Sequence, residues 1–342
     1  MLVVKHMESP ENYRQPAEWS LHESCFLAWP CHENLWEENL KPAQLEFAKL
    51  CRAIAEGETL QVLVNDKKAL ADAEVALSGL PIRFHVIPYG DIWLRDTAPI
   101  FVRNRAGQIA CAKFGFNGWG QKYELPFDNE VSSRIANLSD VPVFSHSWIL
   151  EGGSIEVDGE GTCLTSKQCL LNPNRNPDLN QHEIEAALKH SLGIQKVLWL
   201  TEGLLNDHTD GHIDTIARFV APHVVACMEA IGLDDPNAEV LESIAEKLSE
   251  FTDSSGTRLT VVKIPSPGRV LSQAGEILPA SYLNFYIGNS TVVVPTYGST
   301  HDQAAVEAIA KLFPTRKTIG SPAYAILSGG GAFHCITQQV PL

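Results

Sequence analysis

The sequence predicts an α/β fold built from degenerate repeats of a strand–strand–helix–strand unit. Short apolar stretches typical of strands come in pairs, an amphipathic stretch typical of a helix follows each pair, and this order recurs along the chain. At 342 residues the chain exceeds the size at which one simple core stops growing, which favours two domains or one large repeat-built domain. Because no low-complexity linker divides the sequence, one repeat-built architecture is the better expectation.

The N-terminal part predicts helices and strands in alternation. Apolar residues recur at helical spacing after Pro42, which suits a first helical turn, and Gly79 ends a second amphipathic stretch. Two runs rich in Val, Leu and Ile separate or follow these stretches. The expected elements are a helix over 41–56, a strand over 59–65, a helix over 67–78 and a strand over 81–89.

The same order continues to the C-terminal region. The expected elements are strands over 98–103 and 108–114, a helix near 127–138, strands over 153–157 and 161–165, a helix over 180–191, a strand over 195–200, strands over 212–219 and 223–228, a helix over 237–250, a strand over 258–264, strands over 281–286 and 290–295, and a helix over 301–313. If such units close around an axis, strand ends from different units converge there, and distant motifs share one site.

A cysteine behind three glycines is the first candidate for chemistry. Residues 328–335 read Ser-Gly-Gly-Gly-Ala-Phe-His-Cys, and three consecutive glycines let a ligand approach the main chain closely. We interpret Cys335 as a nucleophile, which needs a base or cationic help to form the thiolate. The alternative is a buried cysteine that acts as a small hydrophobe.

A second candidate is the run His208-Thr-Asp210-Gly-His212-Ile-Asp214. If this run is a strand, all four titratable side chains project from one face, because side chains alternate with period two. One interpretation of four titratable side chains on one face is a zinc hydrolase, in which these residues and Cys335 bind the metal. Two further acidic motifs, 91–96 and 151–153, fall in other units.

Composition limits the partners. The formal net charge of −15, from 41 acidic and 26 basic residues, favours a cationic ligand and disfavours nucleic acid and anionic membranes, although acidity also serves solubility. Eight cysteines without a CxxC pair predict reduced thiols and a cytoplasmic location. Neither a signal peptide nor an apolar run of membrane-spanning length is expected.

Five blocks of sequence together resemble the agmatine deiminase and bacterial peptidylarginine deiminase-like family. They are PAEWSLHES (16–24), WLRDTAPIFV (93–102), EGGSIEVDGEGTCLTSKQCLLNPNRNP (151–177), TDGHIDT (209–215) and GGGAFHCITQQ (329–339). The matched blocks run from about 16 to 341, so the resemblance implies a single catalytic domain over 1–342 with residues 1–15 as an N-terminal extension. It also implies the pentein α/β propeller, with five repeats around a central site.

The resemblance assigns the chemistry to five residues. Cys335 matches the nucleophile, which attacks the guanidinium carbon and forms an S-alkylthiouronium intermediate, and His212 matches the general acid/base. Asp96 and Asp214 match the two aspartates that bind the guanidinium through bidentate, charge-assisted hydrogen bonds. Glu151 matches the glutamate that holds His212 and favours its cationic form. No cofactor and no metal are implied.

The expected substrate is agmatine, converted to N-carbamoylputrescine and ammonia in putrescine and polyamine biosynthesis. Trp93, Trp119, Gly330 and Gly331 are expected to line the substrate, although core packing is an equal reading for each tryptophan. A site for arginine would need a cation aimed at the α-carboxylate. Arg95 and Arg175 are the two arginines in the matched blocks that could supply this cation. The resemblance assigns neither of them to the binding of a carboxylate.

Alternatives stay open at this point. Substitutions near the cysteine and in TDGHIDT relative to the agmatine enzymes leave arginine or peptidyl-arginine as possible substrates, and a non-catalytic polyamine binder is a further reading. Family members often form dimers, so a homodimer is expected. Three carboxylates near Cys335 should raise the pKa of its thiol, so we hypothesise that the bound guanidinium assists deprotonation.

Overall fold

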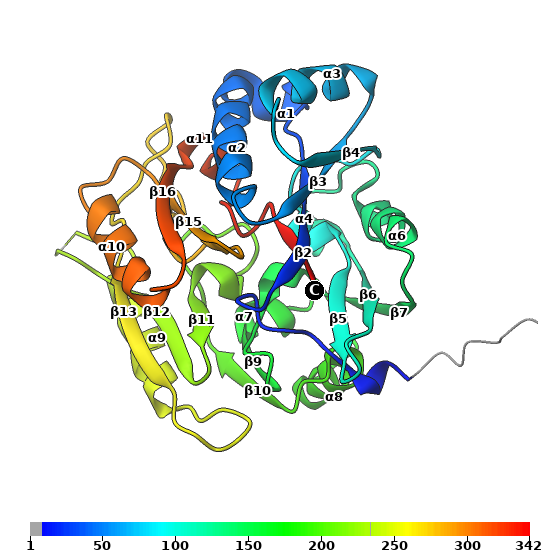
Figure 1. The fold of residues 1–342 in the computed structure, drawn as a ribbon. Coiled ribbons are helices and arrows are strands. Elements are labelled where there is room, and N and C mark those ends of the chain that lie inside the picture. Colours follow the sequence, from blue (N-terminus) through cyan, green and yellow to red (C-terminus); the bar gives the residue numbers. More distant parts are fainter. Residues whose placement is uncertain (1–8, 233) are drawn as a thin grey trace, which may run out of the picture.

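Five small sheets stand around a common centre in the computed structural model, which describes residues 9–232 and 234–342 (Figure 1). Each sheet begins with an antiparallel pair and continues with a parallel pair. A parallel pair needs a crossover connection, and a helix supplies it in every repeat. The predicted five ββαβ repeats are thereby confirmed.

The strands, sheet by sheet, have the following bounds. The first sheet holds β1 (Tyr13–Arg14), β5 (Ile100–Asn104), β6 (Ile109–Gly115) and β7 (Val143–Ile149); the second β8 (Ile155–Val157), β9 (Thr162–Ser166) and β10 (Lys196–Leu200); the third β11 (Ala217–Ala221), β12 (Val224–Glu229) and β13 (Thr260–Pro265); the fourth β14 (Tyr286–Ile287), β15 (Thr291–Thr296) and β16 (Lys317–Pro322); the fifth β17 (Gln338–Pro341), β2 (His22–Ala28), β3 (Thr59–Val64) and β4 (Ile82–Val86).

The longer helices lie on the outside of the ring, between parallel strands (Figure 1). They are α2 (Leu40–Ile54), α3 (Lys67–Ala76), α6 (Asp128–Leu138), α8 (Gln181–Leu192), α9 (Ala238–Glu250) and α10 (Asp302–Leu312). Short helical turns connect other elements: α1 (Glu33–Trp36), α4 (Leu94–Thr97), α5 (Gly118–Gln121), α7 (Lys167–Leu170) and α11 (Tyr324–Leu327), with the 3₁₀ turns η1 (Pro10–Asn12), η2 (Glu37–Asn39), η3 (Gly152–Ser154) and η4 (Ile213–Thr215).

Helix ends follow their capping residues. The side chain of Asp66 accepts a hydrogen bond from the amide of Ala69 at 2.8 Å and so begins α3. Asn180 and Glu183 form a reciprocal capping box at the start of α8. Gly193 ends α8 with a φ of +69°, a left-handed conformation that glycine adopts without a steric penalty. These local signals explain why the predicted ends of both helices fall close to the observed ones.

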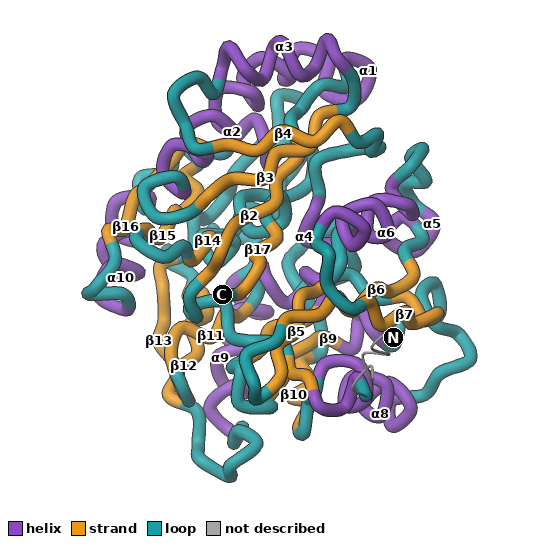
Figure 2. Tube along the Cα trace, turned by 45° about the vertical axis from the view of Figure 1, so that its right-hand side comes forward, coloured by secondary structure: helices purple, strands orange, loops and turns teal. Residues whose placement is uncertain are grey.

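The two ends of the chain close the ring. Strand β17 pairs antiparallel with β2, so that Gln338 lies opposite Phe26 and Gln339 opposite Cys25 (Figure 2). This pairing brings the segment before β17, which carries Cys335, into the centre of the molecule. No helix among residues 9–232 and 234–342 is long and apolar enough to cross a membrane.

Two predicted strands are wrong in part. The segment predicted as a strand over 212–219 follows a tight turn, in which Asp210 and Gly211 have φ of +66° and +79°, and it forms η4 before β11 starts at Ala217. The carboxylate of Asp207 accepts hydrogen bonds from the amides of Thr209 and His212 and stabilises this turn. The four titratable side chains of this run therefore do not line one face of a strand.

The second wrong prediction is the strand over 281–286, of which only the last residue lies in β14. Ser281 instead makes a local turn, since its hydroxyl accepts a hydrogen bond from the amide of Leu283. The irregular backbone places Asn284 beside the cysteine. Strands not predicted from the sequence include β2, β7, β16 and β17.

Candidate active site

Three short turns from different repeats meet at the centre of the ring. The 3₁₀ turn η3 packs against both α4 and η4, and these turns carry or flank Asp96, Glu151 and Asp214. Gly153 lies where they meet, and a β-carbon there would come within 2.7 Å of His212 Nδ1 and 2.9 Å of Asp96 Oδ1. Only glycine leaves room for these side chains to converge.

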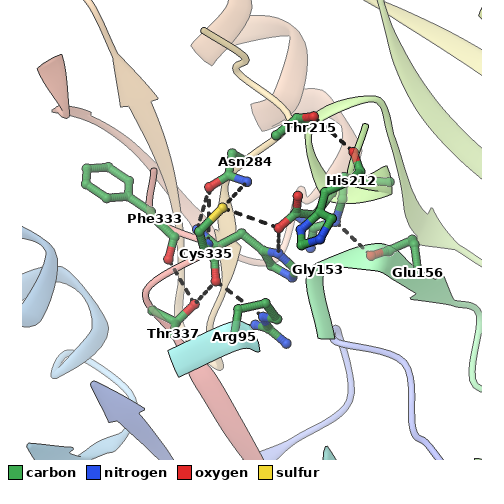
Figure 3. Close-up of polar contacts among 12 residues, drawn as sticks. Arg95, Gly153, Glu156, His212, Thr215, Asn284, Phe333, Cys335 and Thr337 are labelled. Carbon is green, nitrogen blue, oxygen red and sulfur yellow. Dashed lines mark hydrogen bonds and ion pairs between the residues drawn. The ribbon is translucent and has the colours of Figure 1, made fainter. Parts of the chain in front are cut away.

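Cys335 lies in this centre, with 6% of its surface exposed. The amide nitrogen of the Asn284 side chain donates a hydrogen bond to Sγ at 3.1 Å, and the Asn284 oxygen accepts one from the Cys335 amide at 3.2 Å (Figure 3). The thiol lies 3.5 Å from Asp214 Oδ2, its carboxylate acceptor. Burial first, and then the charges of Asp214 and Asp96, raise the pKa of the Cys335 thiol well above its ordinary value.

The glycine run makes a tight approach to Cys335. A β-carbon at Gly331 would lie 2.8 Å from the Trp93 ring and 3.0 Å from Cys335 Sγ. Gly330 has a φ of +119°, which side-chain-bearing residues rarely adopt. The predicted contact of Gly330 and Gly331 with a substrate stays a prediction; Gly331 lies next to the sulfur, and Gly330 faces His208.

Asp96 and Asp214 are both buried and are held differently. Asp96 accepts hydrogen bonds from Trp119 Nε1 at 2.8 Å and from the Gly153 amide at 2.9 Å, and burial raises the pKa of its carboxyl group. Burial also acts to raise the pKa of Asp214, but the hydrogen bond from His334 and its charge outweigh burial and lower it. Asp214 Oδ1 is buried without a hydrogen-bond partner among the described residues.

His212 faces these carboxylates. Its Nδ1 lies 3.8 Å from Asp96 Oδ2 (Figure 3 shows its position relative to Cys335). Burial acts to lower the pKa of the imidazole, but Asp96, the Cys169 thiol and Glu151 outweigh burial and raise the pKa well above its ordinary value. The surroundings therefore favour the cationic ring, which is the form that a group protonating a leaving amine needs.

Glu151 acts on His212 through its charge. Its Oε1 accepts a hydrogen bond from Arg175 Nε at 2.8 Å, while its Oε2 is buried without a partner among the described residues. The family resemblance predicts that Glu151 holds His212. The structure places the two side chains close together, but the hydrogen bond of Glu151 is to Arg175.

Trp93 and Trp119 flank the site from two sides. Trp93 donates its indole N–H to Asp91 at 2.8 Å and stacks on Trp36 with ring centroids 6.2 Å apart. Trp119 donates its indole N–H to Asp96, so that its ring adjoins the predicted guanidinium site. Both rings are buried and belong to the hydrophobic core, and their contact with a substrate stays a prediction.

A buried ionic network behind Asp214 was not predicted from the sequence. His334 bridges Asp214 Oδ2 and Glu18 Oε2, at 2.7 Å each. Arg218 then binds Glu18 at 2.7 Å and Glu156 at 2.9 Å. The signal was present in the sequence, since Glu18 and His334 both lie within the matched blocks.

The two suspect arginines both bind the protein's own groups. Arg95 donates its amide N–H to the Cys335 carbonyl at 3.0 Å and its Nε–H to the His334 carbonyl at 3.2 Å, which fixes the cysteine loop. Arg175 binds Glu151 and Asp210. Neither arginine is placed to meet a substrate carboxylate.

The predicted zinc ligand set is not assembled. His208 stacks on the Tyr123 ring, with centroids 5.9 Å apart, and Asp210 binds Lys122 and Arg175. Among residues 9–232 and 234–342, the one set of three His, Cys, Asp or Glu side chains with ligand atoms close enough for a metal consists of Glu151, Cys169 and His212. Of the five predicted ligands, only His212 belongs to it.

Comparisons with known proteins agree with this geometry. The family model of the Porphyromonas-type peptidyl-arginine deiminases matches residues 14–341. A curated protein from Legionella pneumophila is 39% identical over 338 residues, which cover 97% of this chain and 97% of that protein. The agmatine deiminase of Enterococcus faecalis superposes with a TM-score of 0.92 at 32% identity, over 98% of both chains.

Two further solved structures mark the near and far relatives. A Campylobacter jejuni agmatine deiminase, a cysteine-to-serine variant with substrate bound, superposes with a TM-score of 0.88 at 29% identity, over 96% of both chains. An amidinotransferase of saxitoxin biosynthesis from Microseira wollei has a TM-score of 0.53 at 12% identity, over 96% of this chain and 97% of its own. That last likeness concerns the fold alone, which is the pentein propeller.

Proposed function

The chain belongs to the Porphyromonas-type peptidyl-arginine deiminase family, and from this membership and the site geometry we propose that it is an agmatine deiminase. It hydrolyses agmatine to N-carbamoylputrescine and ammonia, a step of putrescine and polyamine biosynthesis. The observation that carries the proposal is one buried centre in which Cys335 Sγ adjoins Asp214, and Asp96 adjoins His212. Such a centre binds a planar cation and attacks it from one side.

Binding comes first. Asp214 Oδ1 and the carboxylate of Asp96 accept the N–H donors of the guanidinium, whose planar fork matches two carboxylates. The unpartnered Asp214 oxygen gains a donor in this way, and burying it unpaired costs about 1–3 kcal/mol. The substrate's positive charge then lies beside Cys335, where it opposes the effect of both aspartates on the pKa of the thiol.

The thiol proton leaves when the guanidinium binds, with Asp214 Oδ2 as the nearest acceptor at 3.5 Å. Deprotonation is thus assisted by the substrate, because burial and both aspartates raise the pKa of the thiol in the free protein. We expect iodoacetamide to alkylate Cys335 of the free protein slowly at neutral pH and faster only in the alkaline range. An inflection near pH 6, far below an ordinary thiol pKa of about 8.5, would contradict this step.

Two covalent steps follow. The thiolate forms a C–S bond to the guanidinium carbon, cationic His212 gives its proton to a terminal nitrogen, and the C–N bond breaks to release ammonia. Neutral His212 then takes a proton from water, whose oxygen attacks the thiouronium carbon. The C–S bond breaks while the hydroxyl proton of the adduct passes to the departing sulfur, which returns the Cys335 thiol and the neutral ureido product. The proton that Asp214 first accepted leaves with ammonia as ammonium. Glu151 supports the cationic form of His212 at the start of each cycle.

The mouth of the site favours a slender substrate. Tyr123 and His208, from two different loops, are joined by a hydrogen bond of 3.2 Å, and His208 Nδ1 lies 3.7 Å from a β-carbon placed on Gly330. Lys122 ties the same loops together through the His208 carbonyl at 2.5 Å. The four-carbon chain and ammonium of agmatine need less room beside these joined loops than a peptide backbone does.

The charge of the far end points the same way. Arginine brings an α-carboxylate, which needs a cationic partner. Arg95 and Arg175, the two arginines considered for that role, already bind a carbonyl and carboxylates of the protein. Agmatine instead brings a second positive charge to a protein of net charge −15. We therefore rank free arginine and peptidyl-arginine below agmatine as substrates. A non-catalytic function as a polyamine binder ranks below a deiminase acting on any of the three.

The test compares ammonia release from agmatine, free arginine and an arginine peptide as kcat/KM on one preparation. We expect agmatine to lead by at least about 100-fold, the discrimination that about 2.7 kcal/mol provides. A lead for arginine or the peptide would overturn the substrate and leave the deiminase chemistry. Tight agmatine binding without ammonia release would overturn the chemistry itself. The predicted homodimer and cytoplasmic location stay predictions; light scattering after size-exclusion chromatography checks the first.

A further inference from the structure

A second buried cysteine, Cys169, lies close to His212. The proposed reaction gives this thiol no role. The sulfur of Cys169, a ring nitrogen of His212 and a carboxylate oxygen of Glu151 lie within 4.8 Å of one another, and all three side chains are buried. Cys169 lies in α7, Glu151 precedes η3 and His212 precedes η4. We call these three residues the Cys169 cluster.

The Cys169 cluster contains buried polar atoms without a hydrogen-bond partner among the described residues. Glu151 Oε2 and both ring nitrogens of His212 are buried, and none of them has a hydrogen-bond partner among the residues that the structure describes. Each such atom costs about 1–3 kcal/mol while it is unpaired. A ligand that bonds to a carboxylate oxygen and an imidazole nitrogen at once would remove this cost.

The chemistry of the donors selects the ligand. A thiolate, an imidazole and a carboxylate are the three donor types that bind zinc, whereas magnesium and calcium take oxygen donors. Bonds of about 2.0–2.3 Å in a tetrahedral arrangement put ligand atoms roughly 3–4 Å apart. A separation of at most 4.8 Å closes to that value through a small movement of side chains.

We propose that the Cys169 cluster is an inhibitory zinc site, in which Cys169 Sγ, Glu151 Oε2 and one ring nitrogen of His212 bind one Zn²⁺ ion. Binding displaces the thiol proton of Cys169 and the ring proton of that His212 nitrogen, and both are released to solvent. The metal then occupies the nitrogen lone pair that a proton would take. His212 can no longer transfer protons, so hydrolysis stops until the metal leaves.

The surroundings of the cluster support this geometry. Arg175 Nε holds Glu151 Oε1 at 2.8 Å, which leaves Oε2 as the free donor and fixes the orientation of the carboxylate. Asp96 lies 3.8 Å from His212 Nδ1 and adds a negative charge near the metal. Agmatine would place its guanidinium on the same Asp96. Binding of the metal therefore competes with binding of the substrate.

Binding is tested with Cd²⁺, a zinc analogue whose thiolate complex absorbs in the ultraviolet. We expect wild type, Cys335→Ser and Cys31→Ser to bind one Cd²⁺ per chain with the thiolate band, and Cys169→Ser to lose it. Cys31 is the matched control because it is half-buried beside His32, another pair of possible ligands. A band that persists in Cys169→Ser, disappears in Cys335→Ser or never forms in wild type overturns the site.

A second variant covers the case in which Cys169→Ser does not fold. Glu151→Gln keeps every thiol and removes one charged donor, so we expect its Cd²⁺ affinity to fall at least about tenfold with the thiolate band still present at saturation. Circular dichroism shows that each variant is folded before titration. An unchanged Cd²⁺ affinity in Glu151→Gln contradicts the proposed ligand set.

Inhibition is tested separately, and this part alone rests on the proposed function. We expect Zn²⁺ to inhibit ammonia release from agmatine, EDTA to restore it, and Cys169→Ser to need at least about 30-fold more Zn²⁺ for half-inhibition relative to its own uninhibited rate. Cadmium bound through Cys169 without inhibition by zinc overturns the role of His212 and leaves the metal site. Agmatine hydrolysis without cadmium binding overturns the metal site and leaves the function.

Discussion

Cys335 and Cys169 are two buried thiols around one histidine, and the charges that surround them differ. Burial is the largest cause that raises the pKa of both. For Cys335 the next causes are the charges of Asp214 and Asp96, which raise the pKa further. For Cys169 the next cause is the neighbouring His212, whose interaction with the sulfur lowers it.

Ordinary reasoning about reactive cysteines would choose the thiol next to a cationic histidine. That rule selects Cys169, which lies in a helical turn away from the glycine run. Cys335 has a less favourable electrostatic environment in the free protein, but the two aspartates that disfavour its thiolate are the groups that we propose to bind a guanidinium. The comparison teaches that a nucleophile for a cationic substrate is activated by the charge that arrives with the substrate.

The largest effect that would break this comparison is loss of Cys335. We expect Cys335→Ala to lower kcat by about 10⁴-fold or more, because no other group supplies the covalent step. Mass spectrometry of wild type during turnover should show an adduct on the peptide that contains Cys335. An adduct on Cys169 instead, or near-normal turnover by Cys335→Ala, would reverse the assignment of the two thiols.

Much of this centre was predictable from the sequence. The strand–strand–helix–strand order gave the architecture, because apolar periodicity survives in each repeat, and the matched blocks gave the residues that meet at the centre. The strand over 212–219 was wrong in its first residues, because a turn with positive φ at Asp210 and Gly211 precedes them and residues 213–215 form η4. The alternation of apolar and polar residues in a sequence does not show which residues have a positive φ.

The residues that support the site could not be predicted from the sequence. Asn284 lies 51 positions before Cys335, in a segment that was expected to be a strand, and only the ring closure brings the two together. Cys169 was one of eight scattered cysteines, and nothing in its local sequence indicates that it meets His212. Long-range contacts of this kind depend on packing, which local periodicity does not encode.

The next effect concerns the two aspartates that distinguish the Cys335 side. We expect Asp96→Asn and Asp214→Asn to lower kcat/KM by about 30- to 5,000-fold, since loss of one partner of a buried charged hydrogen bond costs about 2–5 kcal/mol. Steady-state kinetics and thermal melts of both variants separate binding from folding. A matched loss of stability with an unchanged KM would mean that the aspartates serve the fold and not the substrate.

A smaller effect concerns the charge on His212. Its pKa is raised, so the cationic acid persists through neutral pH and is lost only as the pH rises through that value. Glu151 contributes to the raised pKa, so Glu151→Gln should lower the pKa and move the alkaline limb of the kcat profile to lower pH. At neutral pH we expect a loss of about 10- to 100-fold, within the range of general acid catalysis. A profile that does not move would assign Glu151 to Arg175 alone.

The smallest effect concerns Cys169, the thiol that the proposed reaction does not use. The interaction of its sulfur with His212 also helps to raise the pKa of the imidazole, after the larger contribution of Asp96. Cys169→Ser keeps a hydrogen-bond donor of similar size, so we expect kcat to fall by only about two- to tenfold, a small part of what a general acid supplies. The alkaline limb should shift slightly to lower pH, in the same direction as for Glu151→Gln. Rates measured from pH 6 to 10 on the folded variant check both points. A loss as large as that of Cys335→Ala would show that the two thiols around His212 share the chemistry, and the contrast between them would no longer hold.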